Sequence, residues 1–113
     1  PYAGGELKHG PIALIEKGTV VIALNTNAEL RGKMDSNIKE VVTRGARIVE
    51  ILPDNFENAG EGCDELITVP ATEAILAPVT AVVPLQLLSY HVAIAKGCNV
   101  DKPRNLAKSV TVE

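Results

Sequence analysis

The sequence predicts an α/β fold in which helices cover a mostly parallel sheet. Two features of the chain lead to this prediction. Short, nearly continuous apolar runs recur along the sequence, and a helical pattern of apolar residues stands between the first two runs. The resulting order of strand, helix, strand, loop, strand and helices is typical of βαβ units.

Three segments have the composition of buried strands. TVVIALN occupies residues 19–25, RIVEIL occupies residues 47–52 and ends at Pro53, and ELITV occupies residues 65–69. Parallel sheets usually contain several strands and have both faces covered, so about three strands leave an open edge. We therefore expect further strands upstream or tight association with another chain.

Residues 28–44 show the periodicity of an amphipathic helix, with Asn27 as its amino-terminal cap and Gly45 as the left-handed residue that ends it. The apolar positions are Leu30, Met34, Ile38, Val41 and Val42. The charged positions predict a solvated face, and they include two pairs at i,i+4 spacing, Asp35 with Lys39 and Glu40 with Arg44.

A long apolar stretch follows the third strand, at residues 73–97. Pro78 and Pro84 are expected to divide it into a short helix, a connector and a final helix that begins near Pro84 and ends at Gly97. Apolar side chains surround nearly the whole final helix, which is therefore predicted to be almost entirely buried. His91 on this helix is expected to be a core or interface histidine.

Composition and charge exclude several classes of protein. The 113 residues have the size of one domain and a net charge of −3. The 11 Lys and Arg residues form no basic patch, so no nucleic-acid partner is expected. No apolar run is expected to reach the ~18 residues of a membrane span, and no secretory signal is recognised. These features predict a cytoplasmic protein with no membrane partner.

The sequence indicates neither a metal site nor a bound cofactor. Cys63 and Cys98 match no zinc or redox spacing and are expected to be free thiols. The familiar phosphate-binding glycine motifs are absent. An acidic loop lacks the alternate-ligand spacing of a calcium site, although it contains Asp54, Glu57, Glu61 and Asp64.

Two residues are candidates for catalysis. His9, in GELKHGPIALI, can transfer protons near neutral pH, and Gly10 with Pro11 constrains the backbone beside it. Lys108, in the tail PRNLAKSVTVE, can form a Schiff base only if desolvation or a nearby cation lowers its pKa from about 10.4. From the residue pattern alone, each is more often a surface residue than a catalytic one.

The segments GELKHGPIALI and PLQLLSYHVAIAKG, together with the tail DKPRNLAKSVTVE, resemble the glucosamine-6-phosphate synthase family. The isomerase half of that family consists of two SIS (sugar isomerase) domains. The resemblance covers essentially the whole chain and implies an SIS-type three-layer sandwich, here incomplete. It implies that residues 1–113 are the C-terminal part of the second SIS domain and that residues 101–113 are its catalytic tail.

The resemblance also implies roles for the site residues. His9 matches the histidine that opens the sugar ring, and Lys108 matches the lysine that forms a Schiff base with C2 of fructose-6-phosphate. Ala107, beside that lysine, is implied to bind substrate. The isomerising glutamate and a nearby lysine lie upstream in the family and are absent here. The chain alone is therefore expected to be inactive.

The partners implied by the resemblance are fructose-6-phosphate and ammonia, which comes from glutamine through a glutaminase domain that is missing here. A homodimer is also implied, with the histidine of each subunit serving the neighbouring active site, and no cofactor is needed. Two alternatives remain open. SIS folds also act as non-catalytic sugar-phosphate-binding regulatory modules, and the chain could be a dimerisation fragment without chemistry of its own.

Overall fold

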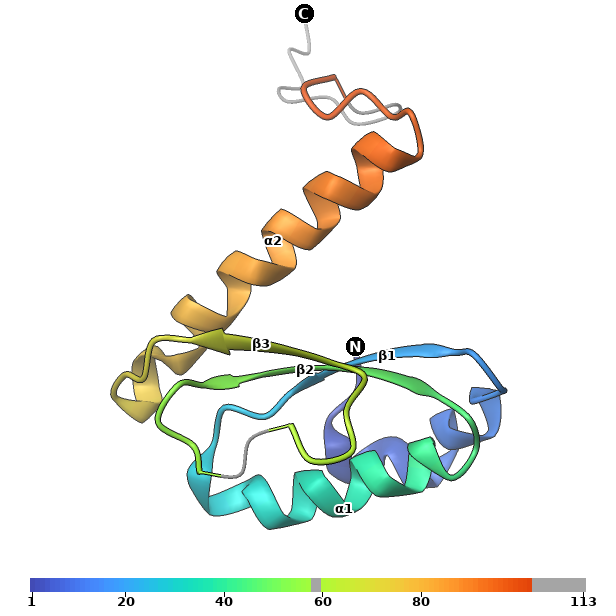
Figure 1. The fold of residues 1–113 in the computed structure, drawn as a ribbon, viewed down its shortest axis with the longest axis vertical. Helices are drawn as coiled ribbons and strands as arrows, with labels where there is room; N and C mark the ends of the chain where they lie inside the picture. Colours follow the sequence, from blue (N-terminus) through green and yellow to red (C-terminus); the bar gives the residue numbers. More distant parts are fainter. Residues whose placement is uncertain (58–59, 103–113) are drawn as a thin grey trace, which may run out of the picture. The chain divides into compact units, whose positions relative to one another are not determined.

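The structure is a computed structural model that describes residues 1–57 and 60–102 (Figure 1). The chain divides into two compact units, Pro1–Ala81 and Val82–Glu113. The elements are the 3-10 helices η1 (Gly4–His9), η2 (Pro11–Leu14), η3 (Ala28–Leu30) and η4 (Ala74–Leu76), the strands β1 (Val20–Leu24), β2 (Arg47–Pro53) and β3 (Glu65–Val69), and the helices α1 (Arg31–Val42) and α2 (Ala77–Ala95).

The three strands form one parallel sheet in the order β1-β2-β3. Val21 is the register partner of Ile48, and Ile51 is the partner of Ile67. The predicted α/β class with three parallel strands is therefore confirmed, and each strand lies within one residue of its predicted bounds. Continuous apolar runs predicted these strands well because the central strand is buried on both faces.

One face of the sheet carries the main core of the first unit. Helix α1 and helix η1 lie on the same side of the sheet (Figure 1). The buried core residues are Ala23, Ile38, Val41, Ala46 and Ile48, and the side chains of Leu7, Ile12 and Ile15 pack against them. The two short helices at the start of the chain are thereby attached to α1 and the sheet, which fixes the segment that contains His9.

The opposite face of β1 is open within the described part of the chain. Ala23 is buried under α1, whereas Val20, Ile22 and Leu24 point to the other face and are 61%, 40% and 40% exposed. β1 and β3 also form the two edges of the described sheet. The expectation that further strands or another chain cover this sheet stays a prediction.

The predicted cap and end of the first helix are confirmed, but its first turn is a 3-10 helix. Oδ1 of Asn27 accepts hydrogen bonds from the backbone N–H groups of Glu29 at 2.9 Å and Leu30 at 3.3 Å. At the other end, Gly45 has a φ of 86° and donates to the carbonyl of Val42 at 2.8 Å. This left-handed conformation favours glycine because a side chain there is strained.

The prediction that Pro84 begins a separate helix is wrong. Helix α2 is continuous through Pro84. Pro78 lies in its first turn, where no backbone N–H partner is needed, and Pro84 removes one intrahelical hydrogen bond while the remaining bonds continue. The predicted end is confirmed, because Gly97 has a φ of 69° and Cys98 donates to the carbonyl of Ala93 at 2.9 Å.

The prediction that this last helix is almost entirely buried is also wrong for this chain. Only Ala77 and Ala81 are buried, and they lie in its first turns. Large apolar side chains farther along are 41–62% exposed, namely Val79, Val82, Val83, Leu87, Tyr90, Val92 and Ile94. Apolar composition favours burial but does not supply a covering element. The described residues of the second unit, 82–102, contain only this helix and the turns that follow it.

His91 is likewise exposed in this chain, so it is not a core histidine, and the expectation that it lies at an interface stays a prediction. Its ring meets the ring of Tyr90 edge-on, with 5.3 Å between the centroids. The expectation that no apolar run reaches the length of a membrane span is wrong as well. The helical segment Ala74–Ala95 has 22 residues and a mean hydropathy of 1.5, which by length and composition alone is enough to cross a membrane. Helices that pack inside larger proteins have the same composition, so this finding is weak evidence for a membrane.

Candidate functional site

His9 is the last residue of η1, and its side chain is exposed. Gly10 follows with a φ of 153°, a conformation that a residue with a side chain rarely adopts, and Pro11 then begins η2. The carbonyl of Gly10 accepts a hydrogen bond from the backbone N–H of Ala13 at 2.9 Å. The sequence KHGP therefore makes a sharp junction between two short helices, and the imidazole is carried at that junction.

The backbone on both sides of His9 is anchored to the core of the first unit. Leu7 precedes the histidine by two residues, and Ile12 follows it by three; both pack against the buried cluster under the sheet. The imidazole itself makes no hydrogen bond or ion pair with residues 1–57 or 60–102. It is thus an accessible proton donor or acceptor on a segment that is anchored to the core before and after it.

Lys8, next to the histidine, forms an ion pair with α1. Its Nζ lies 2.5 Å from Oε1 of Glu40, and the two side chains are 51% and 34% exposed. The predicted pairing of the Glu40 and Arg44 side chains is wrong, because Nη1 of Arg44 donates instead to the backbone carbonyl of Glu40 at 2.7 Å. The Glu40 carboxylate is therefore available to the lysine of the KHGP segment.

Lys108 and Ala107, the other predicted site residues, lie outside the described residues. The structure consequently positions one member of the predicted catalytic pair, His9, and leaves the role of the tail as a proposal.

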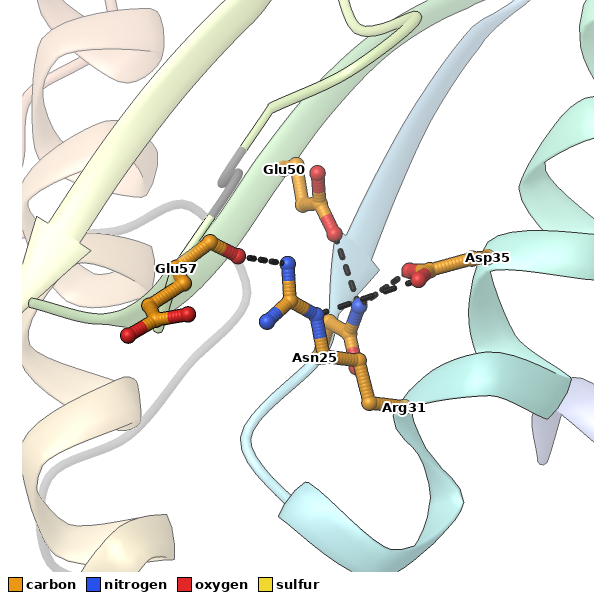
Figure 2. A network of polar contacts seen from close by, with 5 residues as sticks. All are labelled: Asn25, Arg31, Asp35, Glu50 and Glu57. Carbon is orange, nitrogen blue, oxygen red and sulfur yellow. Dashed lines mark hydrogen bonds and ion pairs between the residues drawn. The ribbon is translucent and has the colours of Figure 1, made fainter. Parts of the chain in front are cut away.

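A second polar group was not predicted as a unit from the sequence, and it lies where β1 ends (Figure 2). Nδ2 of Asn25 donates to Oδ1 of Asp35 at 2.9 Å and to Oε1 of Glu50 at 2.8 Å. Asn25 and Glu50 are buried, at 2% and 4% exposure. The amide thereby connects the end of β1 to β2 and to α1, and it supplies the hydrogen bond that a buried carboxylate requires.

Arg31 extends this group towards the loop after β2. Its guanidinium lies 4.9 Å above the ring of Phe56. The same guanidinium donates to the backbone carbonyl of Glu57 (Figure 2). Its Nε lies 3.8 Å from Oδ2 of Asp35, so Asp35 pairs with Arg31 and Asn25, and the predicted pairing of Asp35 with Lys39 is wrong. A cavity of about 340 Å³ adjoins the group and is lined by Arg31, Asp35, Ile38, Lys39, Glu50, Glu57, Gly60 and Glu61.

The chemistry of the Asn25 group is that of a structural network. Each of its donated bonds ends on a protein oxygen, and no buried side-chain nitrogen or oxygen among the described residues lacks a partner. The sequence contained one signal for it, since Glu50 interrupts the apolar run that follows Arg47 in the strand segment RIVEIL. A charged residue at such a position needs a partner from a neighbouring element.

The acidic loop is held by backbone donors. Asp54 accepts from the N–H of Ala71 at 3.0 Å, and Asp64 accepts from the N–H of Ile48 at 2.7 Å. Within residues 1–57 and 60–102, no three His, Cys, Asp or Glu side chains converge as metal ligands would. The carboxylates of this loop therefore orient the chain around β2 and β3.

Both cysteines are free thiols, as predicted. Cys98 is exposed, whereas Cys63 is partly buried and its Sγ donates to the carbonyl of Gly60 at 3.1 Å. Burial raises the pKa of the Cys63 thiol, and the negative charge of Glu50 raises it further. The raised pKa lowers the thiolate fraction of Cys63 and, with it, the reactivity of this thiol.

Comparison with known proteins identifies the family of this chain. Residues 1–96 match the SIS domain family. The chain is 60% identical over 112 residues to glutamine–fructose-6-phosphate aminotransferase (isomerizing) of Clostridium tetani. This alignment covers 99% of this chain and 18% of that protein. It is 52% identical over 113 residues to the protein of the same name from Sphingobium yanoikuyae, covering 99% of this chain and 72% of that one.

A solved structure agrees with these relatives. The C-terminal domain of glucosamine-fructose-6-phosphate aminotransferase from Francisella tularensis matches with a TM-score of 0.77 and 41% identity, over 89% of this chain and 29% of that one. By length, the chain corresponds to less than a fifth of the Clostridium tetani relative. It belongs to the SIS domain family and, within it, to the glutamine–fructose-6-phosphate aminotransferases (isomerizing).

Proposed function

We propose that this chain is the C-terminal part of the second SIS domain, with its tail, of an enzyme that makes glucosamine-6-phosphate from fructose-6-phosphate and glutamine. The observation that carries the proposal is 60% identity over 99% of the chain to a protein named for this reaction. A span of that extent contains both His9 and Lys108. The alternative of a non-catalytic regulatory module has no comparable support among the relatives named above.

The position of His9 supports its assignment to ring opening. Fructose-6-phosphate is closed through the oxygen on C5, so opening requires that this oxygen gain a proton while the hydroxyl on C2 loses one. An imidazole can transfer such a proton near neutral pH. His9 offers an accessible ring on an anchored backbone, and an exposed ring suits the proposed service to the active site of a second subunit in a homodimer.

Lys108 is proposed to hold the opened sugar. Its unprotonated amine attacks C2 of the ketose, water leaves, and the product is an imine between the lysine nitrogen and C2. Ammonia released from glutamine by another domain then replaces the lysine nitrogen, and a proton is moved from C1 to C2. Ala107 is proposed to contact the substrate beside the lysine. This chemistry uses the protein's own amine, so no cofactor is invoked.

The location of the protein also remains a proposal. A cytoplasmic enzyme without a membrane partner agrees with the polar substrates of the proposed reaction. In that case the apolar side chains of α2 are covered by protein.

The test of the function is product formation by the full-length protein. It should convert fructose-6-phosphate and glutamine to glucosamine-6-phosphate, and Lys108→Arg should lower kcat by on the order of 10⁴-fold or more, because a guanidinium stays protonated and forms no imine. Binding of fructose-6-phosphate without turnover in the unmodified protein would instead favour the regulatory module.

A further inference from the structure

One contact at the candidate site is not accounted for by the roles of His9 and Lys108. The KHGP junction is joined to α1 by the ion pair of Lys8 with Glu40, at 2.5 Å. Both partners keep a third or more of their side chains exposed, and such pairs contribute only about 0–1 kcal/mol to folding. The stability of the fold is therefore a weak reason for this contact, and its place beside His9 suggests another.

The geometry shows what the ion pair restrains. Leu7 anchors the chain before the histidine, and Ile12 anchors it afterwards, but His9 and Gly10 between them are exposed. Gly10 is the most permissive backbone position of the segment, with no atom within 4 Å of where its Cβ would be. Of the residues adjacent to His9, Lys8 is the one that forms a side-chain contact with a regular helix.

The partner residue is well suited to this task. Glu40 lies in the last turns of α1, the same helix that supplies Ile38 and Val41 to the buried core. Its carboxylate is therefore carried on a rigid element. Its backbone carbonyl also accepts bonds from Thr43 Oγ1 at 2.8 Å and Arg44 Nη1 at 2.7 Å. The competing cation, Arg44, is thereby directed to the carbonyl and away from the carboxylate.

We infer that Glu40, acting through Lys8, is a positioning residue that holds the His9 imidazole at the angle needed for sugar ring opening. This inference rests on the proposed function and deepens it. Proton transfer depends steeply on the placement of the donor, and a displacement of about 1 Å can lower a rate on the order of 10²-fold. An exposed imidazole beside a glycine depends on such a restraint more than a buried one does.

The test uses the full-length protein and two substrates. Fructose-6-phosphate must be opened before reaction, whereas its 5-deoxy analogue lacks the hydroxyl that closes the furanose ring. Glu40→Gln should lower kcat roughly tenfold with the cyclic sugar and leave kcat with the open analogue within about twofold. KM for either sugar should change little, because Glu40 is not proposed to touch the substrate. Glu29→Gln, an exposed acid in η3 with no ion pair within the described residues, is the matched control and should change neither rate.

A double-mutant cycle separates the ion pair from other roles of its members. Lys8→Met, Glu40→Gln and the double variant should lose the same factor with the cyclic sugar, because each removes the same contact. The exchanged pair, Lys8→Glu with Glu40→Lys, should recover part of the rate. Two results would overturn the inference: equal slowing of the reaction of both substrates by Glu40→Gln, or a double variant that is slower than the unmodified protein by the product of the two single factors.

His9→Ala distinguishes failure of this inference from failure of the proposed function. It should lower kcat with the cyclic sugar on the order of 10²-fold and leave kcat with the open analogue unchanged. If His9→Ala shows that selectivity and Glu40→Gln does not, the positioning role is wrong and the proposed function stands. If His9→Ala slows both substrates equally, the ring-opening role fails and the inference falls with it.

Discussion

Nδ2 of Asn25 donates a 2.8 Å hydrogen bond to Oε1 of Glu50, and both residues are buried, at 2% and 4% exposure. This bond joins the residue that follows β1 to the middle of β2. It allows a carboxylate to occupy a strand whose other residues are mostly apolar, because the charge that burial penalises is partly compensated by the amide.

Removal of the amide should therefore destabilise the sheet. Asn25→Leu keeps a similar side-chain volume but leaves the Glu50 carboxylate buried without that donor, which should lower the free energy of unfolding by about 3 kcal/mol. Thermal unfolding of the full-length protein should show a transition that occurs several degrees lower. The double change Asn25→Leu with Glu50→Leu should recover much of the loss, and a double variant as unstable as Asn25→Leu would contradict this explanation.

Replacement by alanine should change the stability in opposite directions at two glycines, Gly45 and Gly32. Gly45 has a φ of 86°, and a Cβ there would lie 3.0 Å from the backbone Cα of Lys17, so Gly45→Ala should destabilise the protein by about 1–2 kcal/mol or more. Gly32 lies inside α1 with no atom within 4 Å of its Cβ position, so Gly32→Ala should stabilise by up to about 1 kcal/mol. A lower melting temperature in both variants would refute the assigned conformations.

The strands and the first helix could be predicted from the sequence because their signals are local. Apolar runs predict β1 and β2, and Asn27 and Gly45 mark the two ends of the helical region. Helix α2 was predicted less well. Proline has a strong local preference against helix interiors, but one missing hydrogen bond at Pro84 does not end a helix whose other residues favour it.

The site could be predicted only in part. His9 was predicted as a candidate because glycine and proline beside a histidine can be recognised in the sequence. The bond of Asn25 to Glu50 and the ion pair of Lys8 with Glu40 could not be predicted, since they join residues 25 and 32 positions apart. The helical spacing rule instead assigned Lys39 to Asp35 and Arg44 to Glu40, although tertiary partners approach both carboxylates.

The two thiols should differ in reactivity. Burial and the charge of Glu50 raise the pKa of Cys63, so at any pH below that pKa it has a smaller thiolate fraction than an unperturbed thiol, and alkylation by iodoacetamide should be slower than at Cys98. Raising the pH towards the raised pKa of Cys63 should increase the labelling of this thiol. Peptide mass spectrometry measures both sites, and unfolding in guanidinium should remove the difference.

Glu50→Gln provides the matched variant for the thiol experiment. It removes a negative charge that raises the pKa of Cys63, so labelling of Cys63 should begin at a lower pH. A pH profile for Cys63 that does not move would show that the charge of Glu50 does not act on this thiol.

Borohydride trapping is the most direct test of whether Lys108 forms an imine with the sugar. The full-length protein is incubated with fructose-6-phosphate, reduced with borohydride and digested. The mass of the peptide that contains Lys108 is then measured by mass spectrometry. We expect a stable adduct of one reduced sugar phosphate on Lys108, and no adduct in Lys108→Arg. An unmodified Lys108 in a protein that forms glucosamine-6-phosphate would contradict the account.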